Sequence, residues 1–255
     1  MYKMMVSSFY NTLINKDEAI ALDTMLNIDR IRNKGILFVV STAALFRTII
    51  DYNDSYIFSD YVSCYNGAYL YDMNNDKVLY KKNIPVTTLK KLAKLKDFDM
   101  AFCTLNDTYY IGKAYDYDFS IEITDLDDFI SFHKNDIYQI IIHYKKKDLD
   151  EIIKYIKQFN VNYFFKTNGK DKYIEITYKD IDKLNSIKMI CDKKKIKLNE
   201  VVSIGSNSND LNLISNTIGN CVKNGEKEIK KAAKYVTKLD RSLGVNEVIL
   251  KYFEV

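Results

Sequence analysis

The sequence lacks the patterns that mark a secreted or membrane protein. Its four cysteines, at positions 64, 103, 191 and 221, form no C-x-x-C pair and lie in or next to apolar runs, which is typical of reduced, buried thiols. No run of about 18 apolar residues occurs, and the N-terminus lacks the charged-then-apolar pattern of a signal peptide. We therefore expect a soluble, cytoplasmic protein with no membrane partner. Tryptophan is absent and proline occurs once, and neither fact indicates a function.

A concentrated charge of either sign is also missing. Lys and Arg total 38 against 34 Asp and Glu, and the net charge of +4 is spread along the chain rather than gathered into an arm. This distribution gives no indication of a nucleic-acid partner. The two longest basic clusters, at residues 145–147 and 193–195, adjoin helical patterns. We interpret them as solvated helix ends rather than as phosphate-binding patches.

Strands and helices alternate at both ends of the chain. In the first part, short apolar strands are expected at residues 3–8, 36–41 and 61–64, and helices near residues 18–34 and 44–52. After residue 180, helices are expected at residues 182–195, 209–214, 226–234 and 243–253, and strands at residues 201–204 and 218–222. This alternation predicts a parallel sheet that is covered by helices on both faces.

The middle of the chain follows a different pattern. Helical spacing at residues 87–94 and 148–158 is combined with strands rich in Phe, Tyr and Ile, among them a long apolar strand at residues 137–144. Strands that pair through hairpins, with two helices on one face, form an α+β unit. We therefore predict an α/β fold: a Rossmann-like parallel-sheet core from residues 1–83 and 181–255, with an inserted α+β domain at residues 84–180.

Polar residues follow the strands of the predicted core. Ligands bind outside the carboxyl ends of the strands in such sheets, so these loops form the expected site. The loops are Ser8-Phe9-Tyr10-Asn11-Thr12-Leu13, Ser41-Thr42-Ala43-Ala44, Tyr65-Asn66-Gly67-Ala68 and Gly205-Ser206-Asn207-Ser208-Asn209-Asp210. Lys183 opens the helix that precedes the last of these strands.

In this order and spacing, the segments resemble the Cof-type sugar phosphatases of the haloacid dehalogenase superfamily. The resemblance rests on the Asn66-Gly67-Ala68 turn with its following hairpin, the inserted unit, Lys183, and the Gly-x-x-x-Asn-Asp run that ends at Asp210. It covers essentially the whole chain. It implies a HAD-like core with a cap domain that sets substrate choice, and magnesium-dependent hydrolysis of phosphate monoesters.

The catalytic loop departs from the pattern of that family. In the family, the first strand is followed by Asp-x-Asp-Gly-Thr-Leu; the first Asp attacks phosphorus and the second protonates the leaving group. These two catalytic positions hold Ser8 and Tyr10 here, so both are substituted. Asn11 stands at the position of the family's glycine, whereas Thr12 and Leu13 match the pattern.

The remaining family positions are partly retained. The phosphoryl-binding threonine corresponds to Thr42, and the lysine that neutralises nucleophile and phosphate corresponds to Lys183. The magnesium-binding acid of the last motif is replaced by Ser206, and Asp210 is the acid that remains beside it. The resemblance adds three further positions to the expected ligand-binding set, namely Asn66, Gly67 and Asn209.

These substitutions remove the chemistry of the family. Magnesium requires several hard oxygen ligands, and Ser8 and Ser206 stand where the family supplies carboxylates, so we expect no metal and no other cofactor. Tyr10 is a poor base for Ser8 at neutral pH, and we interpret His133 and His143, in the inserted domain, as structural. Losing nucleophile, acid and metal removes on the order of 5 kcal/mol or more of transition-state stabilisation.

Two interpretations of the function stay open. The first is a catalytically inactive relative of sugar phosphatases that binds a small phosphorylated molecule or a protein partner. The second is an active hydrolase or phosphotransferase with a rearranged site that uses Ser8, Lys183 and Asp210, with or without a metal. A purely structural role has no positive support in the sequence, and we interpret the aromatic stripe at residues 109–119 as strand packing.

Overall fold

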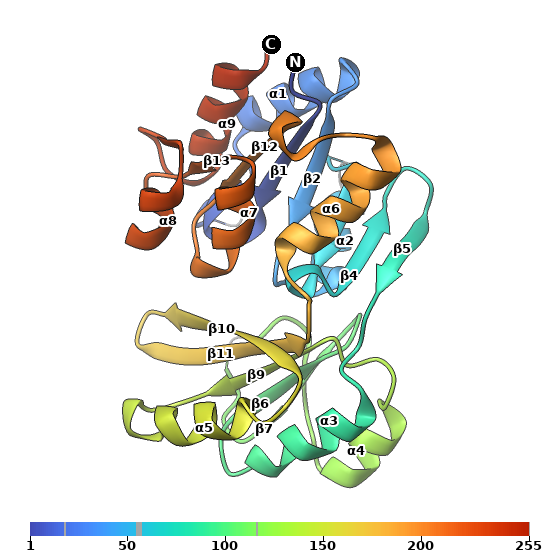
Figure 1. The fold of residues 1–255 in the computed structure, drawn as a ribbon. Helices are drawn as coiled ribbons and strands as arrows, with labels where there is room; N and C mark the ends of the chain where they lie inside the picture. The colour runs from blue at the N-terminus through green and yellow to red at the C-terminus, as the bar shows by residue number, and fades with distance from the viewer. Residues whose placement is uncertain (18, 55–57, 116, 255) are drawn as a thin grey trace.

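The computed structural model describes residues 1–17, 19–54, 58–115 and 117–254. This part of the chain forms two β-sheets, of eight and six strands, in two units that lie one above the other (Figure 1). The chain leaves the larger sheet after β5 (Lys77–Lys81) and returns to it through α6 (Lys183–Lys194). We call the part with the eight-stranded sheet the core unit, and the segment from α3 (Val86–Leu92) to β11 (Asp171–Tyr178) the inserted unit.

The eight-stranded sheet is parallel at its centre. Its order is β14-β13-β12-β1-β2-β3-β4-β5, and all pairs from β14 to β3 are parallel, whereas β4 and β5 are antiparallel. The strands are β1 (Met4–Ser8), β2 (Leu37–Ser41), β3 (Tyr61–Cys64), β4 (Tyr69–Asp72), β5, β12 (Val201–Gly205), β13 (Ile218–Cys221) and β14 (Tyr235–Val236). Ser8 ends the central strand in register with Ser41, at the edge that faces the inserted unit (Figure 1).

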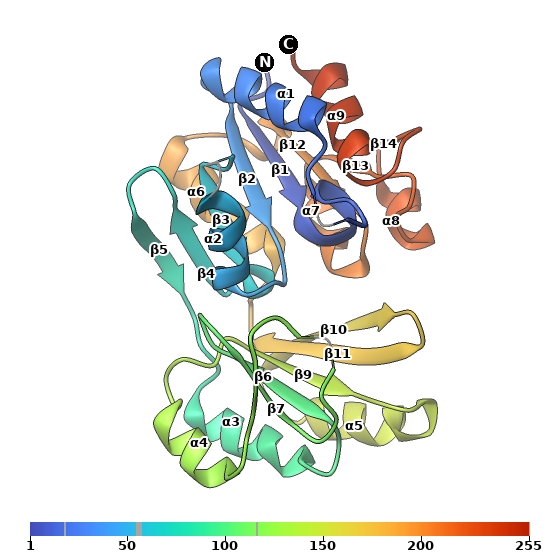
Figure 2. The ribbon, with the colours of Figure 1, turned by 180° about the vertical axis from the view of Figure 1, so that it is seen from behind.

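Helices cover both faces of this sheet because its central strands are apolar on both sides. Met5, Phe38 and Val40 pack against α1 (Leu22–Asn33), α2 (Phe46–Asp54) and α9 (Arg241–Tyr252), which lie in front in Figure 2. Met4, Val6 and Val39 pack against α6 and α7 (Leu211–Asn216), which lie in front in Figure 1. A short α8 (Lys227–Ala232) lies beside β13. The predicted α/β fold with a parallel-sheet core is thus confirmed.

The inserted unit is a six-stranded sheet with helices on one face. The strand order is β10-β11-β9-β6-β7-β8, and every pair is antiparallel except β7 with β8. The strands are β6 (Met100–Cys103), β7 (Thr108–Ile111), β8 (Ser120–Glu122), β9 (Gln139–His143), β10 (Val161–Asn168) and β11. Helices α3, α4 (Leu126–Phe132) and α5 (Leu149–Ile156) cover the face turned away from the core unit (Figures 1 and 2).

The expectation of two helices on this sheet is wrong, because α4 is a third. The Asp125 carboxylate accepts hydrogen bonds from the backbone N–H groups of Asp127 and Asp128, both at 2.9 Å, and so caps the helix. The helix is short and rich in Phe and Ile, so its apolar content alone matches a strand as well as a helix.

No helix in the described ranges is both long enough and apolar enough to cross a bilayer.

Candidate functional site

Three buried polar side chains meet at the carboxyl end of β1. Lys183, the first residue of α6, donates hydrogen bonds to Oδ1 of Asp210 at 2.7 Å and to Oγ of Ser8 at 2.9 Å. Ser8 Oγ in turn donates to the same carboxylate oxygen at 2.9 Å. All three side chains are almost fully buried, so this closed triangle lies in a low-dielectric environment where its charge pairing is strong.

The second carboxylate oxygen of Asp210 is also fully engaged. Oδ2 accepts hydrogen bonds from the backbone N–H groups of Ser206 at 2.8 Å and Asn207 at 3.0 Å. Burial by itself would raise the pKa of Asp210, but the Lys183 ammonium, the more distant Lys166 ammonium and the backbone N–H groups together lower it below its ordinary value. Asp210 is therefore an ionised counter-charge for Lys183 at neutral pH.

A second polar network joins the site to the inserted unit. Asn66, in the turn after β3, donates to Gln139 Oε1 at 3.1 Å and to Glu175 Oε2 at 2.9 Å, and both partners belong to the smaller sheet. Its own Oδ1 accepts from Asn209 at 2.6 Å. These four side chains are buried, so the network fixes the turn after β3 against both the last core loop and the inserted sheet.

Lys166 of β10 extends this network to a second ammonium group. Its Nζ donates to Asn209 Oδ1 at 2.7 Å. Burial lowers the pKa of Lys166, and the nearby positive charge of Lys183 lowers it further, against the opposing effects of Glu175 and Asp210. Two lysines from different units thus approach the same loop of the core.

Gly67 holds the turn after β3 against the start of α6. Its φ of +108° is a conformation that favours glycine, and a Cβ at this position would lie 2.4 Å from the backbone oxygen of Asp182. Asp182 caps α6 by accepting from the backbone N–H of Asn185 at 2.7 Å. The glycine therefore permits the close approach that positions Lys183, the next residue.

The substituted family positions lie in different surroundings. Tyr10 does not join the buried triangle, because its side chain is 37% exposed and its hydroxyl donates to Asp118 Oδ2 of the inserted unit at 3.0 Å. Ser206 Oγ is buried and accepts from Thr12 at 2.9 Å. Asn11 adopts φ 61°, a left-handed conformation that asparagine tolerates better than most residues, which explains why it can stand at the glycine position.

Thr42 directly follows β2, and its hydroxyl accepts from the backbone N–H of Ala44 at 3.1 Å. Its backbone oxygen accepts from the N–H of Asn66 at 2.9 Å, so the second and third loops are tied together. The structure thus brings Ser8, Lys183 and Asp210 into direct contact. It places Thr42, Asn66, Gly67 and Asn209 in the adjoining loops.

The sequence interpretation missed the residues that the inserted unit contributes. Glu175 and Gln139 lie on the face of the smaller sheet that is turned toward the core unit. The sequence does contain a signal for Glu175, because this acid stands between Ile174 and Ile176 in an otherwise apolar stretch. The structure shows that the centre of this strand is buried on both faces. A buried carboxylate there requires a polar partner. Lys166 gave no such signal, because it lies in a hairpin strand of mixed polarity.

These relationships are those of an α/β protein with an inserted unit that lies over the carboxyl ends of the core strands (Figure 1). The sequence model of the haloacid dehalogenase-like hydrolases matches residues 10–249. The chain therefore belongs to the haloacid dehalogenase-like hydrolases, in their Cof-type branch.

Individual relatives agree over almost the whole chain. The chain is 20% identical over 259 residues to the 5-amino-6-(5-phospho-D-ribitylamino)uracil phosphatase YitU of Bacillus subtilis, covering 96% of this chain and 95% of that protein. A haloacid dehalogenase-like hydrolase from Bacteroides thetaiotaomicron superposes with a TM-score of 0.83 at 21% identity, covering 99% and 100% of the two chains. A HAD subclass IIB sugar phosphatase gives 0.81 at 18% identity, with 98% of both chains covered. At these identities, the two structures show the fold.

The residues present do not fit the magnesium ion that the family uses. Hydroxyl groups of Ser8 and Ser206 stand at carboxylate positions, and both oxygens of Asp210 are engaged by the Lys183 ammonium and by backbone N–H groups. In the described part of the chain, no three His, Cys, Asp or Glu side chains are grouped so that they could hold a metal ion. Magnesium prefers near-octahedral oxygen ligands with carboxylates among them, so this donor set is a poor match.

Proposed function

We propose that this protein binds a small phosphorylated molecule at the Ser8–Lys183–Asp210 site and does not hydrolyse it. The proposal of inactivity is supported by the nucleophile position, where a neutral hydroxyl replaces a carboxylate. In the mechanism of the family, a carboxylate attacks phosphorus and an acid two residues further along the chain protonates the leaving group. Tyr10, which stands at that second position, points away toward Asp118.

Ligand binding is supported by the two lysines, and the surroundings of Lys166 carry the proposal. Its Nζ donates a hydrogen bond to the neutral amide oxygen of Asn209, and within the described residues no carboxylate lies within ion-pair distance of that Nζ. An ammonium group in partly desolvated surroundings is stabilised by an anion. A phosphoryl group between Lys166 and Lys183 would supply that charge without a metal.

Calorimetric titration with glucose 6-phosphate, with glucose as the uncharged reference, tests binding. We expect wild-type protein to bind the phosphate ester with a dissociation constant in the millimolar range or tighter, and Lys166→Met to lose about tenfold or more, equivalent to about 1.4 kcal/mol. Lys154→Met, which removes an exposed lysine on α5, is the matched control and is expected to bind like wild type. Absence of binding to glucose 6-phosphate and to inorganic phosphate at millimolar concentrations would contradict the proposal.

A second candidate function is an active hydrolase that uses Ser8 as nucleophile. One observation favours it: Ser8 Oγ donates to Asp210 Oδ1 at 2.9 Å, which is the geometry of a nucleophile and its base. The lowered pKa of Asp210 opposes it, since a carboxylate that holds its proton so weakly is a poor general base. Loss of phosphatase activity on Ser8→Ala would support this second candidate. The expectation that the chain binds a partner protein stays a prediction.

A further inference from the structure

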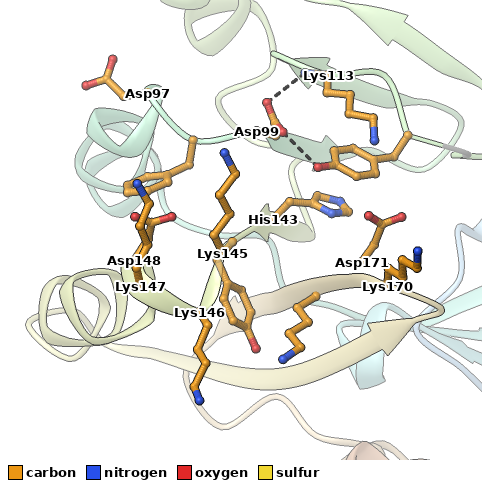
Figure 3. Close-up of a pocket in the computed structure, with 14 residues that line it drawn as sticks. Asp97, Asp99, Lys113, His143, Lys145, Lys146, Lys147, Asp148, Lys170 and Asp171 are labelled. Carbon is orange, nitrogen blue, oxygen red and sulfur yellow. Dashed lines mark hydrogen bonds between the residues drawn. The ribbon is translucent and has the colours of Figure 1, made fainter.

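A hollow of about 760 Å³ lies in the inserted unit, formed by residues that the proposed function does not use (Figure 3). Its walls come from the loop before β6, the loop after β7, the end of β9 with the segment that leads from it to α5, and the turn between β10 and β11. Figure 3 shows His143 near the middle of this hollow, with lysines on several sides of it. The volume is in the range of small-molecule binding sites.

Lysine is the most frequent residue in the wall of this hollow. Six lysines and four aspartates line it, namely Lys113, Lys145, Lys146, Lys147, Lys170, Lys172, Asp97, Asp99, Asp148 and Asp171. Across the ranges that the structure describes, none of these lysines forms an ion pair with a carboxylate. Asp99 is already engaged, because it accepts from the Tyr115 hydroxyl at 2.9 Å and from the backbone N–H of Lys113 at 3.0 Å. The hollow therefore has an excess of positive charge that is not neutralised by its own acids.

The buried imidazole of His143 is the second observation. Its side chain stacks on the Tyr115 ring, with 3.4 Å between the ring centroids, and its Nε2 lies 2.6 Å from the Tyr117 hydroxyl. His143 is 8% exposed, and its Nδ1 has no hydrogen-bond partner among the described residues. Burial raises the pKa of Tyr117, so the phenol keeps its proton and can donate it to Nε2. The Nδ1 atom then carries the imidazole hydrogen and has no acceptor among the described residues.

We propose that this hollow binds a small molecule that carries a diphosphate or polyphosphate group. The six ammonium groups are spread around the hollow, which matches several phosphoryl groups in a row better than one. The bound anion places negative charge beside the imidazole of His143 and between the lysines of the segment that joins β9 to α5 and of the β10–β11 hairpin. The cluster at residues 145–147, interpreted from sequence as a solvated helix end, becomes part of this binding site. The site shares no residue with the Ser8–Lys183–Asp210 cluster.

Histidine NMR gives a site-specific test, because the chain contains two histidines. His133 does not line the hollow, and its Nδ1 lies 3.0 Å from Oδ2 of Asp136. Its NMR signals are therefore an internal reference. Titration with inorganic pyrophosphate at neutral pH is expected to shift the ring signals of His143 in a saturable manner and to leave those of His133 in place. Signals of His143 that stay unchanged up to millimolar pyrophosphate would overturn the proposal.

Charge variants separate a formed site from general attraction. Lys145→Gln/Lys170→Gln/Lys172→Gln is expected to weaken pyrophosphate binding at His143 by at least tenfold. The control Lys193→Gln/Lys194→Gln/Lys195→Gln removes the same charge from the end of α6 and is expected to bind like wild type. An equal loss in both triple variants would overturn the proposal. Lys166→Met removes a charge near the Ser8–Lys183–Asp210 site and none from the hollow. An unchanged response of the His143 signals to pyrophosphate in that variant therefore distinguishes this proposal from the function proposed above.

Discussion

The ammonium group of Lys183 lies 2.7 Å from Oδ1 of Asp210, and both side chains are almost fully buried. A buried ion pair gains strong attraction but also costs the hydration of both ions, so its net contribution to stability is small. Removing one partner has a different result, because the other charge stays buried without compensation. The stability of the core unit therefore depends strongly on keeping both charges of this pair, which lies in the candidate site.

Asp210→Asn is expected to lower the free energy of unfolding by about 3–5 kcal/mol, because it leaves the Lys183 ammonium buried beside a neutral amide. The double variant Lys183→Met/Asp210→Asn removes both charges and is expected to be at least about 1 kcal/mol more stable than Asp210→Asn. Urea denaturation measures both. Lys3→Met, which breaks the exposed ion pair with Glu200, is the control and is expected to change stability far less. Equal stability of the single and double variants would contradict a compensated buried pair.

Acid is expected to destabilise the protein through Asp210. The pKa of this carboxyl is lowered in the folded state, so the unfolded chain binds the proton first as the pH falls. The stabilisation is complete above the unfolded pKa of about 3.9 and is lost as the pH falls from there through the folded pKa. Stability measured between pH 5 and about pH 2 is expected to fall more steeply for wild type than for Lys183→Met/Asp210→Asn. Parallel curves would show that Asp210 does not contribute.

His143 is expected to make stability depend on pH in a higher range. Burial lowers its pKa to about 4 in the folded state, so the unfolded chain binds a proton near pH 6.5 while the folded imidazole stays neutral. Stability is therefore full above about pH 6.5 and decreases toward pH 4, by at most about 3 kcal/mol. A His143→Phe variant is expected to flatten this part of the curve. NMR titration of the two imidazoles measures the pKa values directly, and an ordinary pKa for His143 would contradict the expectation.

Gly67→Ala is expected to destabilise the protein more than Gly35→Ala, by more than about 1 kcal/mol. Both glycines have positive φ, at +108° and +79°, so both substitutions introduce backbone strain. A Cβ on Gly67 meets the backbone oxygen of Asp182 at 2.4 Å, whereas a Cβ on Gly35 meets nothing within 4 Å. Thermal denaturation of the two variants measures the difference. Equal losses would show that the contact with α6 is easily relaxed.

Much of the site is predictable from sequence because neighbouring parallel strands end at the same edge of a sheet. Ser8 and the Asp210 loop follow strands β1 and β12, which pair in register, so their contact follows from the fold. Lys166 and Glu175 depend instead on how the inserted sheet is placed on the core, and that placement results from packing between distant segments. The direction of the Tyr10 side chain could not be predicted from the sequence either, because it depends on the turn at residues 9–13 and on the position of Asp118.

Turnover of para-nitrophenyl phosphate, with and without magnesium, tests the proposed inactivity most directly. Wild type is to be compared with Ser8→Asp/Tyr10→Asp/Ser206→Asp, which restores the carboxylates of the family positions. We predict no magnesium-dependent turnover by wild type and measurable magnesium-dependent turnover by the triple variant. Magnesium-dependent turnover by wild type that Ser8→Ala abolishes would contradict the proposal and assign catalysis to Ser8.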